Sequence, residues 1–136
     1  MKTIKTFENY VAENAIKKLW NKLFGLKRGD VVLREGTGRG SDDIYLLLEP
    51  IDDTKEKVEV LEIGSFARNV NNERYCSLVY NTKTAQPTSI AANSPEFKSY
   101  RPLTKEEKKM YNEEIKSGEF SRYINKTKEL TGIQLK

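Results

Sequence analysis

The chain of 136 residues contains no histidine and a single cysteine, Cys76. Without histidine it cannot build an imidazole-dependent serine or cysteine triad, a histidine-ligated metal site or a histidine pH switch. One thiol rules out an intramolecular disulfide or a thiolate metal cage within the chain. Because no histidine is present to activate it, we expect Cys76 to be a buried, inert thiol, and we expect no cofactor.

Long apolar stretches are also missing. The first twenty residues lack the apolar run of a signal peptide, and no window approaches twenty apolar residues. We therefore expect a soluble, cytoplasmic protein with no role at a membrane. The apolar content of 37% is enough for one modest core, which predicts a single domain over residues 1–136.

The net charge of +4 is too small for an obvious nucleic-acid wrapper, but it is unevenly distributed. Residues 1–28 carry +5, residues 29–104 carry −3 and residues 105–136 carry +2. A basic N-terminal segment therefore precedes a mildly acidic middle region. This polarity can either dock the segment on the rest of the chain or orient a partner.

Residues 7–24 predict an amphipathic helix, because their apolar side chains recur at three- and four-residue spacings. Gly25 follows the last of them, as expected of a glycine that ends a helix. Near the C-terminus, Thr104 and Glu107 form a capping-box pattern that predicts a helix ending at Gly118. A second short helix is predicted from Phe120 to Leu130, so that the helical pair occupies residues 104–131.

Between the helices, residues 29–92 contain short β-rich segments separated by polar turns. Four strands are predicted over residues 30–35, 43–49, 57–66 and 74–81, with a weaker fifth over 87–92, joined as an antiparallel meander. In the third strand, Val58 and Val60 alternate with one parity and Leu61 and Ile63 with the other. This break predicts a β-bulge near Val60 and Leu61 that curls the sheet. The fold class is therefore α+β, with an SH3-like barrel expected first and an OB-like barrel second.

Two polar motifs have competing interpretations. The segment GTGRGSDD (residues 36–43) could cradle a phosphate, but it lacks the Lys-Ser or Lys-Thr of a P-loop and precedes a strand, which favours a hairpin loop with Arg39 exposed at its tip. The acidic pairs at residues 42–43 and 52–53 could hold a divalent cation. Acidic residues beside turns are common without any metal, so no metal site is predicted.

Aromatic side chains suggest a surface for a partner. Tyr75 and Tyr80 on one predicted strand, with Tyr45 on another, could form the aromatic face that small barrels use to bind peptides or bases. Strand alternation turns some of them into the core instead. The predicted partner-binding residues are Arg39, Tyr45, Tyr75 and Tyr80.

Cationic residues suggest a different ligand. A nucleic-acid surface would use Lys17, Lys18, Lys22, Lys27 and Arg28 together with Arg39. The alternative is a solvated helix face whose apolar side packs on the barrel.

Two stretches, KRGDVVLRE (residues 27–35) and YRPLTKEEKKMYNEEIKSGEF (residues 100–120), resemble a pattern in small uncharacterised proteins of bacteriophages and prophages with an SH3-like β unit. The resemblance implies a mobile-element accessory protein that binds a host or phage protein, and it brings no catalytic residues.

Three functions follow from the residues. A non-enzymatic protein-binding module is favoured, because surface recognition needs no catalytic group. The first alternative is a nucleic-acid-binding protein that uses the basic N-terminal helix. The second is a small carboxylate-based hydrolase, such as a nuclease or glycosidase. The sequence predicts neither the identity of the partner nor the oligomeric state.

Overall fold

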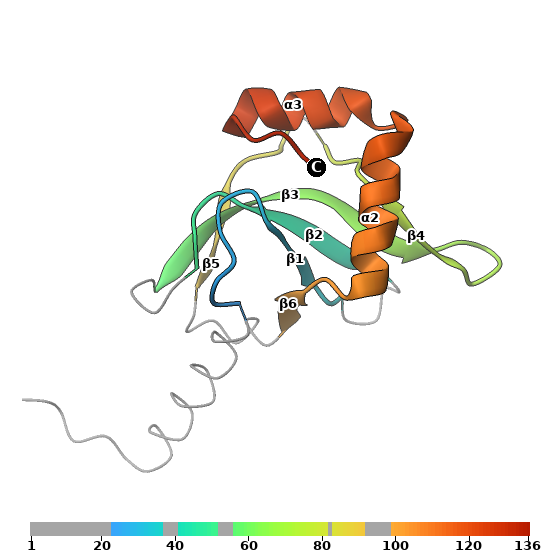
Figure 1. Cartoon of the computed structure of the whole chain (residues 1–136), viewed down its shortest axis with the longest axis horizontal. Helices are drawn as coiled ribbons and strands as arrows, with labels where there is room; N and C mark the ends of the chain where they lie inside the picture. Colours follow the sequence, from blue (N-terminus) through green and yellow to red (C-terminus); the bar gives the residue numbers. More distant parts are fainter. Residues whose placement is uncertain (1–22, 37–40, 52–55, 82, 92–98) are drawn as a thin grey trace, which may run out of the picture.

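The computed structural model describes residues 23–36, 41–51, 56–81, 83–91 and 99–136. Within these ranges the chain forms a curled antiparallel sheet of six strands with two helices on one of its faces (Figure 1). This is the predicted α+β arrangement, with one strand more than expected. The helix predicted over residues 7–24 lies outside the described residues apart from its last two positions, and Arg39 lies outside them as well.

The strands are β1 (Val31–Arg34), β2 (Asp42–Leu47), β3 (Lys57–Arg68), β4 (Arg74–Ser77), β5 (Thr88–Ala91) and β6 (Tyr100–Pro102). Strands β1 to β4 pair in sequence as the predicted meander, and the full order across the sheet is β4-β3-β2-β1-β6. The antiparallel pairing of β1 with β2 makes the GTGRGSDD segment their hairpin connection.

One predicted feature of the meander is wrong, and one strand of the sheet was not predicted. Strand β5 does not continue next to β4 but pairs with the first half of β3, on the edge whose second half pairs with β4. This occurs because the fourth strand ends at Ser77, four residues before the predicted end, and the chain leaves the sheet before it returns. The short β6, which was not predicted, pairs with β1 at the opposite edge and ends in proline, as an edge strand can.

The parity break in β3 has a different cause from the predicted bulge. Val58 and Val60 face one side of the sheet and Leu61 and Ile63 the other, and all four are buried because both faces are covered. The irregularity lies further along, where Ile44 pairs with Gly64 and Tyr45 pairs with Glu62, leaving Ile63 as an extra residue. Ordinary alternation explains the valine and leucine positions, and the bulge instead turns Phe66 to the same face as Ile63.

Two apolar clusters therefore lie on opposite faces of the sheet. The larger, on the helix face, combines strand residues with side chains from the helices and the C-terminal segment: Leu33, Ile44, Leu46, Leu61, Ile63, Phe66, Cys76, Leu78, Leu103, Tyr111, Ile124, Ile133 and Leu135. The smaller, on the other face, contains Leu23, Val32, Tyr45, Leu47, Ile51, Val58, Val60 and Ile90.

Helix α2 (Lys105–Ser117) begins with the predicted capping box at Thr104, and Gly118 ends it in the left-handed conformation with φ of 79°. Helix α3 (Ser121–Thr131) follows and ends at Gly132 in the same way. No helix in the described part of the chain is long and apolar enough to cross a membrane.

Candidate functional site

Exposed apolar side chains concentrate around β4. Of the four large hydrophobic residues that are exposed in the described ranges, Val70, Tyr75 and Val79 lie on the β3–β4 hairpin and the segment directly after β4, and only Leu130 lies elsewhere. Val70 is fully exposed, while Tyr75 and Val79 are 45% and 48% exposed. We call Val70, Tyr75 and Val79 the β4 surface. Singly exposed apolar residues are ordinary, but three within ten residues mark this part of the molecule.

The hairpin that carries Val70 is held by local polar contacts. The Asn69 side-chain oxygen accepts hydrogen bonds from the backbone amides of Asn71 at 2.9 Å and Glu73 at 3.0 Å. Asn72 takes the left-handed conformation with φ of 61°, which asparagine tolerates, and its carbonyl accepts from Arg68 at 2.9 Å. The turn thus presents Val70 on an ordered tip that projects beyond the sheet (Figure 1).

Small residues lie beside Tyr75 on the same face of the sheet. Tyr75 pairs with Ala67, and the neighbouring pair is Ser77 with Ser65. Their chain neighbours Phe66 and Cys76 point to the helix face, so these four side chains point to the other. Because serine and alanine rise little above a sheet, the ring of Tyr75 stands at the edge of a low, partly exposed floor. Within the described residues β4 pairs only with β3, so this floor ends at a sheet edge.

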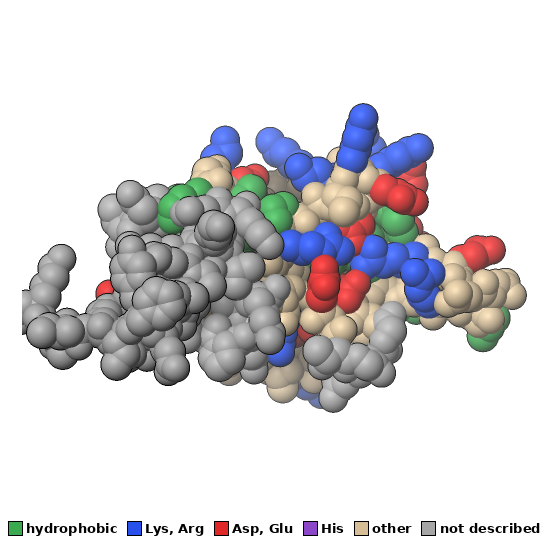
Figure 2. Space-filling model, turned by 90° about the horizontal axis from the view of Figure 1, so that it is seen from below, with side chains coloured by type: hydrophobic (Ala, Val, Ile, Leu, Met, Phe, Trp, Pro, Cys, Tyr) green, Lys and Arg blue, Asp and Glu red, His purple; other side chains and the backbone are tan. Residues whose placement is uncertain are grey.

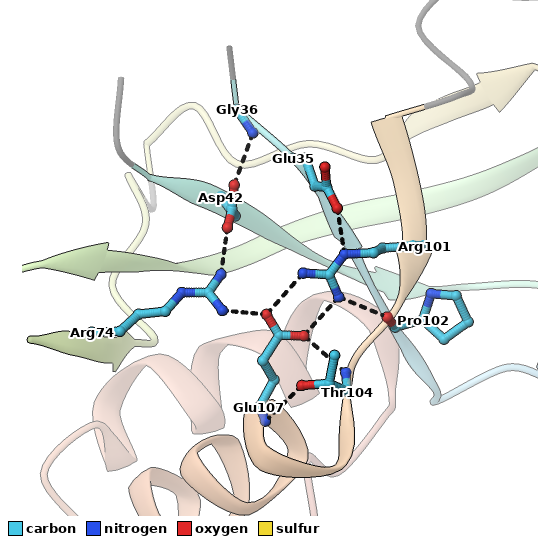
Figure 3. Close-up of polar contacts among 8 residues, drawn as sticks. All are labelled: Glu35, Gly36, Asp42, Arg74, Arg101, Pro102, Thr104 and Glu107. Atoms are coloured by element: carbon cyan, nitrogen blue, oxygen red, sulfur yellow. Dashed lines mark hydrogen bonds and ion pairs between the residues drawn. The ribbon is translucent and has the colours of Figure 1, made fainter. Parts of the chain in front are cut away.

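On the helix face, a network of ion pairs joins helix α2 to the sheet beside β4 (Figure 3). Its centre is Glu107, which is 2% exposed. Arg101 donates two hydrogen bonds to the Glu107 carboxylate, at 2.7 and 3.0 Å, and Arg74 donates another. The backbone amide of Thr104 donates a fourth, at 2.8 Å, to Oε1. Each oxygen of this carboxylate thus accepts two hydrogen bonds, which leaves Glu107 no acceptor position for a ligand.

The outer members of the network tie it to the β1–β2 connection. Arg74 also donates to Asp42, which accepts in addition from the backbone amide of Gly36 at 2.9 Å, and Arg101 donates to Glu35. The Arg74 guanidinium lies 4.8 Å from the centre of the Phe66 ring. Helix α2, strands β4 and β6 and the base of the GTGRGSDD hairpin are thereby joined through charged groups.

The charges of this network act strongly on Glu107. Burial by itself would raise its pKa, but the hydrogen bonds from Arg101, the Thr104 amide and Arg74 outweigh burial and lower the pKa to about 2. The hydrogen bond from Arg101 to Glu107 in turn raises the pKa of that guanidinium, against the opposing effect of burial. A carboxylate held ionised in this way stabilises the fold and is unsuited to general acid chemistry.

A second polar group lies on the opposite face. Tyr45 is 6% exposed, and its ring lies 5.8 Å from that of Tyr100. Burial raises the pKa of Tyr45, and a hydrogen bond with Arg34 partly opposes this. Partial burial of the Glu62 carboxyl and then the charge of Asp43 raise the pKa of Glu62, with Arg34 again opposing. These residues border the floor beside β4, because Asp43 pairs with Ser65 across β2 and β3.

The structure separates the predicted partner-binding tyrosines. Tyr75 is exposed on the β4 surface, whereas Tyr45 is buried on the same sheet face and presents no ring to a partner. Tyr80 turns towards α3, where its hydroxyl shares a 2.8 Å hydrogen bond with Thr127 and its ring lies 5.7 Å from that of Tyr123. Tyr80 therefore anchors a helix.

The predicted nucleic-acid residues are only partly described. Lys17, Lys18, Lys22 and Arg39 lie outside the described residues, and Lys27 is exposed. Arg28 donates hydrogen bonds to the carbonyl oxygens of Thr131, at the end of α3, and of Leu48, the latter at 3.2 Å. Arg28 therefore links the end of α3 to the segment after β2, and these contacts stabilise the fold.

The structure also bears on the acidic pairs and on Cys76. Asp42 and Asp43 point to opposite faces of the sheet, so they cannot share a cation, and no three carboxylate or thiol side chains gather for a metal in the described ranges. Residues 52 and 53 lie outside those ranges. Cys76 is 4% exposed, and burial, followed by the charge of Glu114, raises its pKa to about 12, which leaves it an inert thiol.

Sequence reasoning missed Val70 and Val79 as surface residues. A signal for both was present: the NVNN turn (residues 69–72) places an apolar residue where turns are polar, and Val79 alternates with Tyr75 through Ser77. The arginine partners of Glu107 carried no such signal, because they are brought together only by the sheet.

A scan against protein-family models, a search of curated proteins and a search of solved structures found no match to this chain.

Proposed function

We propose that this protein is a non-enzymatic binding module that recognises another protein through the β4 surface. The observation that supports this most is the concentration of Val70, Tyr75 and Val79 on the β3–β4 hairpin and the segment directly after it, at a sheet edge. A partner that covered them would bury exposed apolar area without disrupting either core, because Val70, Tyr75 and Val79 belong to neither apolar cluster.

The surroundings favour a protein as the ligand. A low floor of Ser65, Ala67 and Ser77 lets an apolar side chain of the partner approach the sheet beside the Tyr75 ring. Tyrosine is enriched in protein interfaces, because it offers a large rigid area and a hydroxyl group. Asp43 and Glu62 at the border of the floor add acidic character, so we expect basic groups on the matching part of the partner.

The SH3-like description of the curled sheet and the resemblance to phage proteins extend this proposal. A small barrel of a mobile element that acts by occupying a host or phage protein would need a surface of this kind and no catalytic group. The saturated hydrogen bonding of Glu107 accords with a binding role, because the most buried carboxylate of the described residues is committed to the fold.

Affinity capture tests the proposal. The full chain, the double variant Y75A/V79A and the control L130A would be used as baits in the same lysate. Leu130 is exposed to a similar extent, 47%, but lies on α3. We expect one dominant protein with wild type and with L130A, and at least about a tenfold loss with Y75A/V79A. Equal recovery by all three baits, or no specific protein under several growth conditions, contradicts the proposal.

A further inference from the structure

Helix α2 carries a row of lysines on the side that faces away from the sheet. Lys105, Lys108, Lys109 and Lys116 are all exposed, whereas Glu107 and Tyr111 on the other side are buried. With 3.6 residues per turn, Lys105, Lys109 and Lys116 lie within about 40° of one another around the helix axis, and the row is about 16 Å long. We call these four residues the α2 lysine row.

Among the described residues, the lysines of the row have no ion-pair partner. In the described part of the chain, no carboxylate lies within ion-pair distance of any of the four lysines, although other lysines and arginines do have such partners. Glu107 is engaged with arginines, and Glu106 and Glu113 lie along one flank of the row only. Figure 2 shows Lys and Arg side chains projecting from the upper edge of the molecule in that view.

We propose that the α2 lysine row contacts the phosphate backbone of a nucleic acid. This function goes beyond protein recognition and uses a different surface from β4. The complementary charge is the first argument: a straight row of this length would run along a stretch of duplex that carries roughly ten phosphate charges in total on its two strands. The second is the absence of exposed apolar side chains among these positions, where Asn112 occupies the gap between Lys109 and Lys116. An interfacial helix needs apolar residues to enter a membrane, so a lipid surface is disfavoured.

The expected binding is electrostatic and independent of sequence. Four phosphate contacts predict that the logarithm of the affinity falls with the logarithm of salt concentration with a slope of about −3.6. Between about 50 and 200 mM salt the affinity should therefore fall roughly 100-fold. Each lysine removed should reduce the steepness of the slope by about 0.9.

The experiment measures fluorescence anisotropy of a labelled duplex DNA of about 20 base pairs with the full chain and two variants that change the net charge equally. The first replaces the row: K105Q/K108Q/K109Q/K116Q. The second replaces four exposed lysines elsewhere: K57Q/K83Q/K128Q/K136Q. Both reduce the net charge from +4 to zero. Circular dichroism and thermal unfolding establish that both variants fold as wild type does.

We expect the row variant to lose at least about 30-fold in affinity at 50 mM salt and the control variant less than about threefold. An equal loss in both variants would show a general charge effect and overturn the proposal, as would wild-type binding by the row variant. The variant K17Q/K18Q/K22Q tests whether the basic N-terminal segment binds the DNA instead. If it abolishes binding while the row variant does not, the N-terminal segment is the nucleic-acid surface. Binding of anionic phosphatidylglycerol vesicles that is lost in the row variant, without DNA binding, would assign the row to membranes instead.

Discussion

Replacing Glu107 with glutamine removes the central charge of the ion network while preserving the shape of the side chain. In the folded protein the pKa of Glu107 is lowered to about 2 from its ordinary value of 4.5. Since one pKa unit corresponds to about 1.4 kcal/mol, the ionised carboxylate contributes roughly 3 kcal/mol to the free energy of unfolding at neutral pH. Breaking a buried ion pair by removing one partner typically costs a similar amount, about 3–5 kcal/mol.

The pH dependence distinguishes this effect from a simple packing defect. Because the folded-state pKa is depressed, the stabilisation is complete above the unfolded-state value near 4.5 and is lost as pH falls towards 2. Glutamine does not titrate, so the difference in free energy of unfolding between wild type and E107Q should shrink to less than about half of its neutral value by pH 3. Acid destabilises the folded protein because the Glu107 carboxyl binds a proton more tightly in the unfolded chain than in the folded one.

Urea unfolding of wild type, E107Q and the control E113Q, followed by circular dichroism between pH 7 and pH 3, measures this difference. Glu113 is exposed on the same helix, so E113Q should change the free energy of unfolding by less than about 0.5 kcal/mol. A wild-type stability in E107Q, or a difference that stays constant with pH, would refute the electrostatic explanation of the network.

Three further predictions concern packing and polar contacts within the fold. Urea unfolding should show that G64A loses about 2 kcal/mol of stability, because the added Cβ would lie 2.1 Å from the carbonyl oxygen of Ser77. A change below about 0.5 kcal/mol would contradict this, since it would show that β3 and β4 move apart at little cost. Cys76 should react with iodoacetamide at pH 8 at least about 100-fold more slowly in the folded protein than in urea, because burial holds its pKa at about 12, and comparable rates would place the thiol in solvent. Y80F should cost about 1 kcal/mol by removing the hydrogen bond to Thr127. In a double-mutant cycle the losses of Y80F and T127V should be less than additive, and strict additivity would show that the two hydroxyls do not interact.

Local signals in the sequence predicted the elements whose chemistry is local. Thr104 and Glu107 form the expected capping box, because both bonds lie within one helical turn. Gly118 ends α2 as predicted, since glycine takes the left-handed conformation without the steric cost of a side chain. The four consecutive strands of the meander were also predicted, because polar turns separate their apolar runs.

The misplaced features depend on contacts between distant residues. Both faces of the sheet are covered, so Val60 and Leu61 are buried on opposite sides, and no local pattern distinguishes this from a bulge. The pairing of β5 with β3 follows from where the chain leaves the sheet after Ser77. Three residues ending in Pro102 are too few to predict a strand without knowing that β1 has a free edge.

The candidate site was predicted in part. Tyr75 is exposed as an interface residue must be, whereas the burial of Tyr45 depends on which side of β2 is covered. The capping role of Glu107 was visible in the sequence, but its pairing with Arg74 and Arg101 was not. Arg74 lies 33 positions away along the chain, and only the sheet brings it to the helix.

Site-specific photocrosslinking tests the β4 surface most directly. The photoreactive residue p-benzoylphenylalanine would replace Tyr75, Val79 or the control Leu130, one at a time, in the full chain inside cells. If the β4 surface binds a protein, the same covalent adduct forms from positions 75 and 79 and is absent from position 130. An adduct of equal yield from position 130, or no adduct from positions 75 and 79 in cells where position 130 forms one, would contradict the assignment.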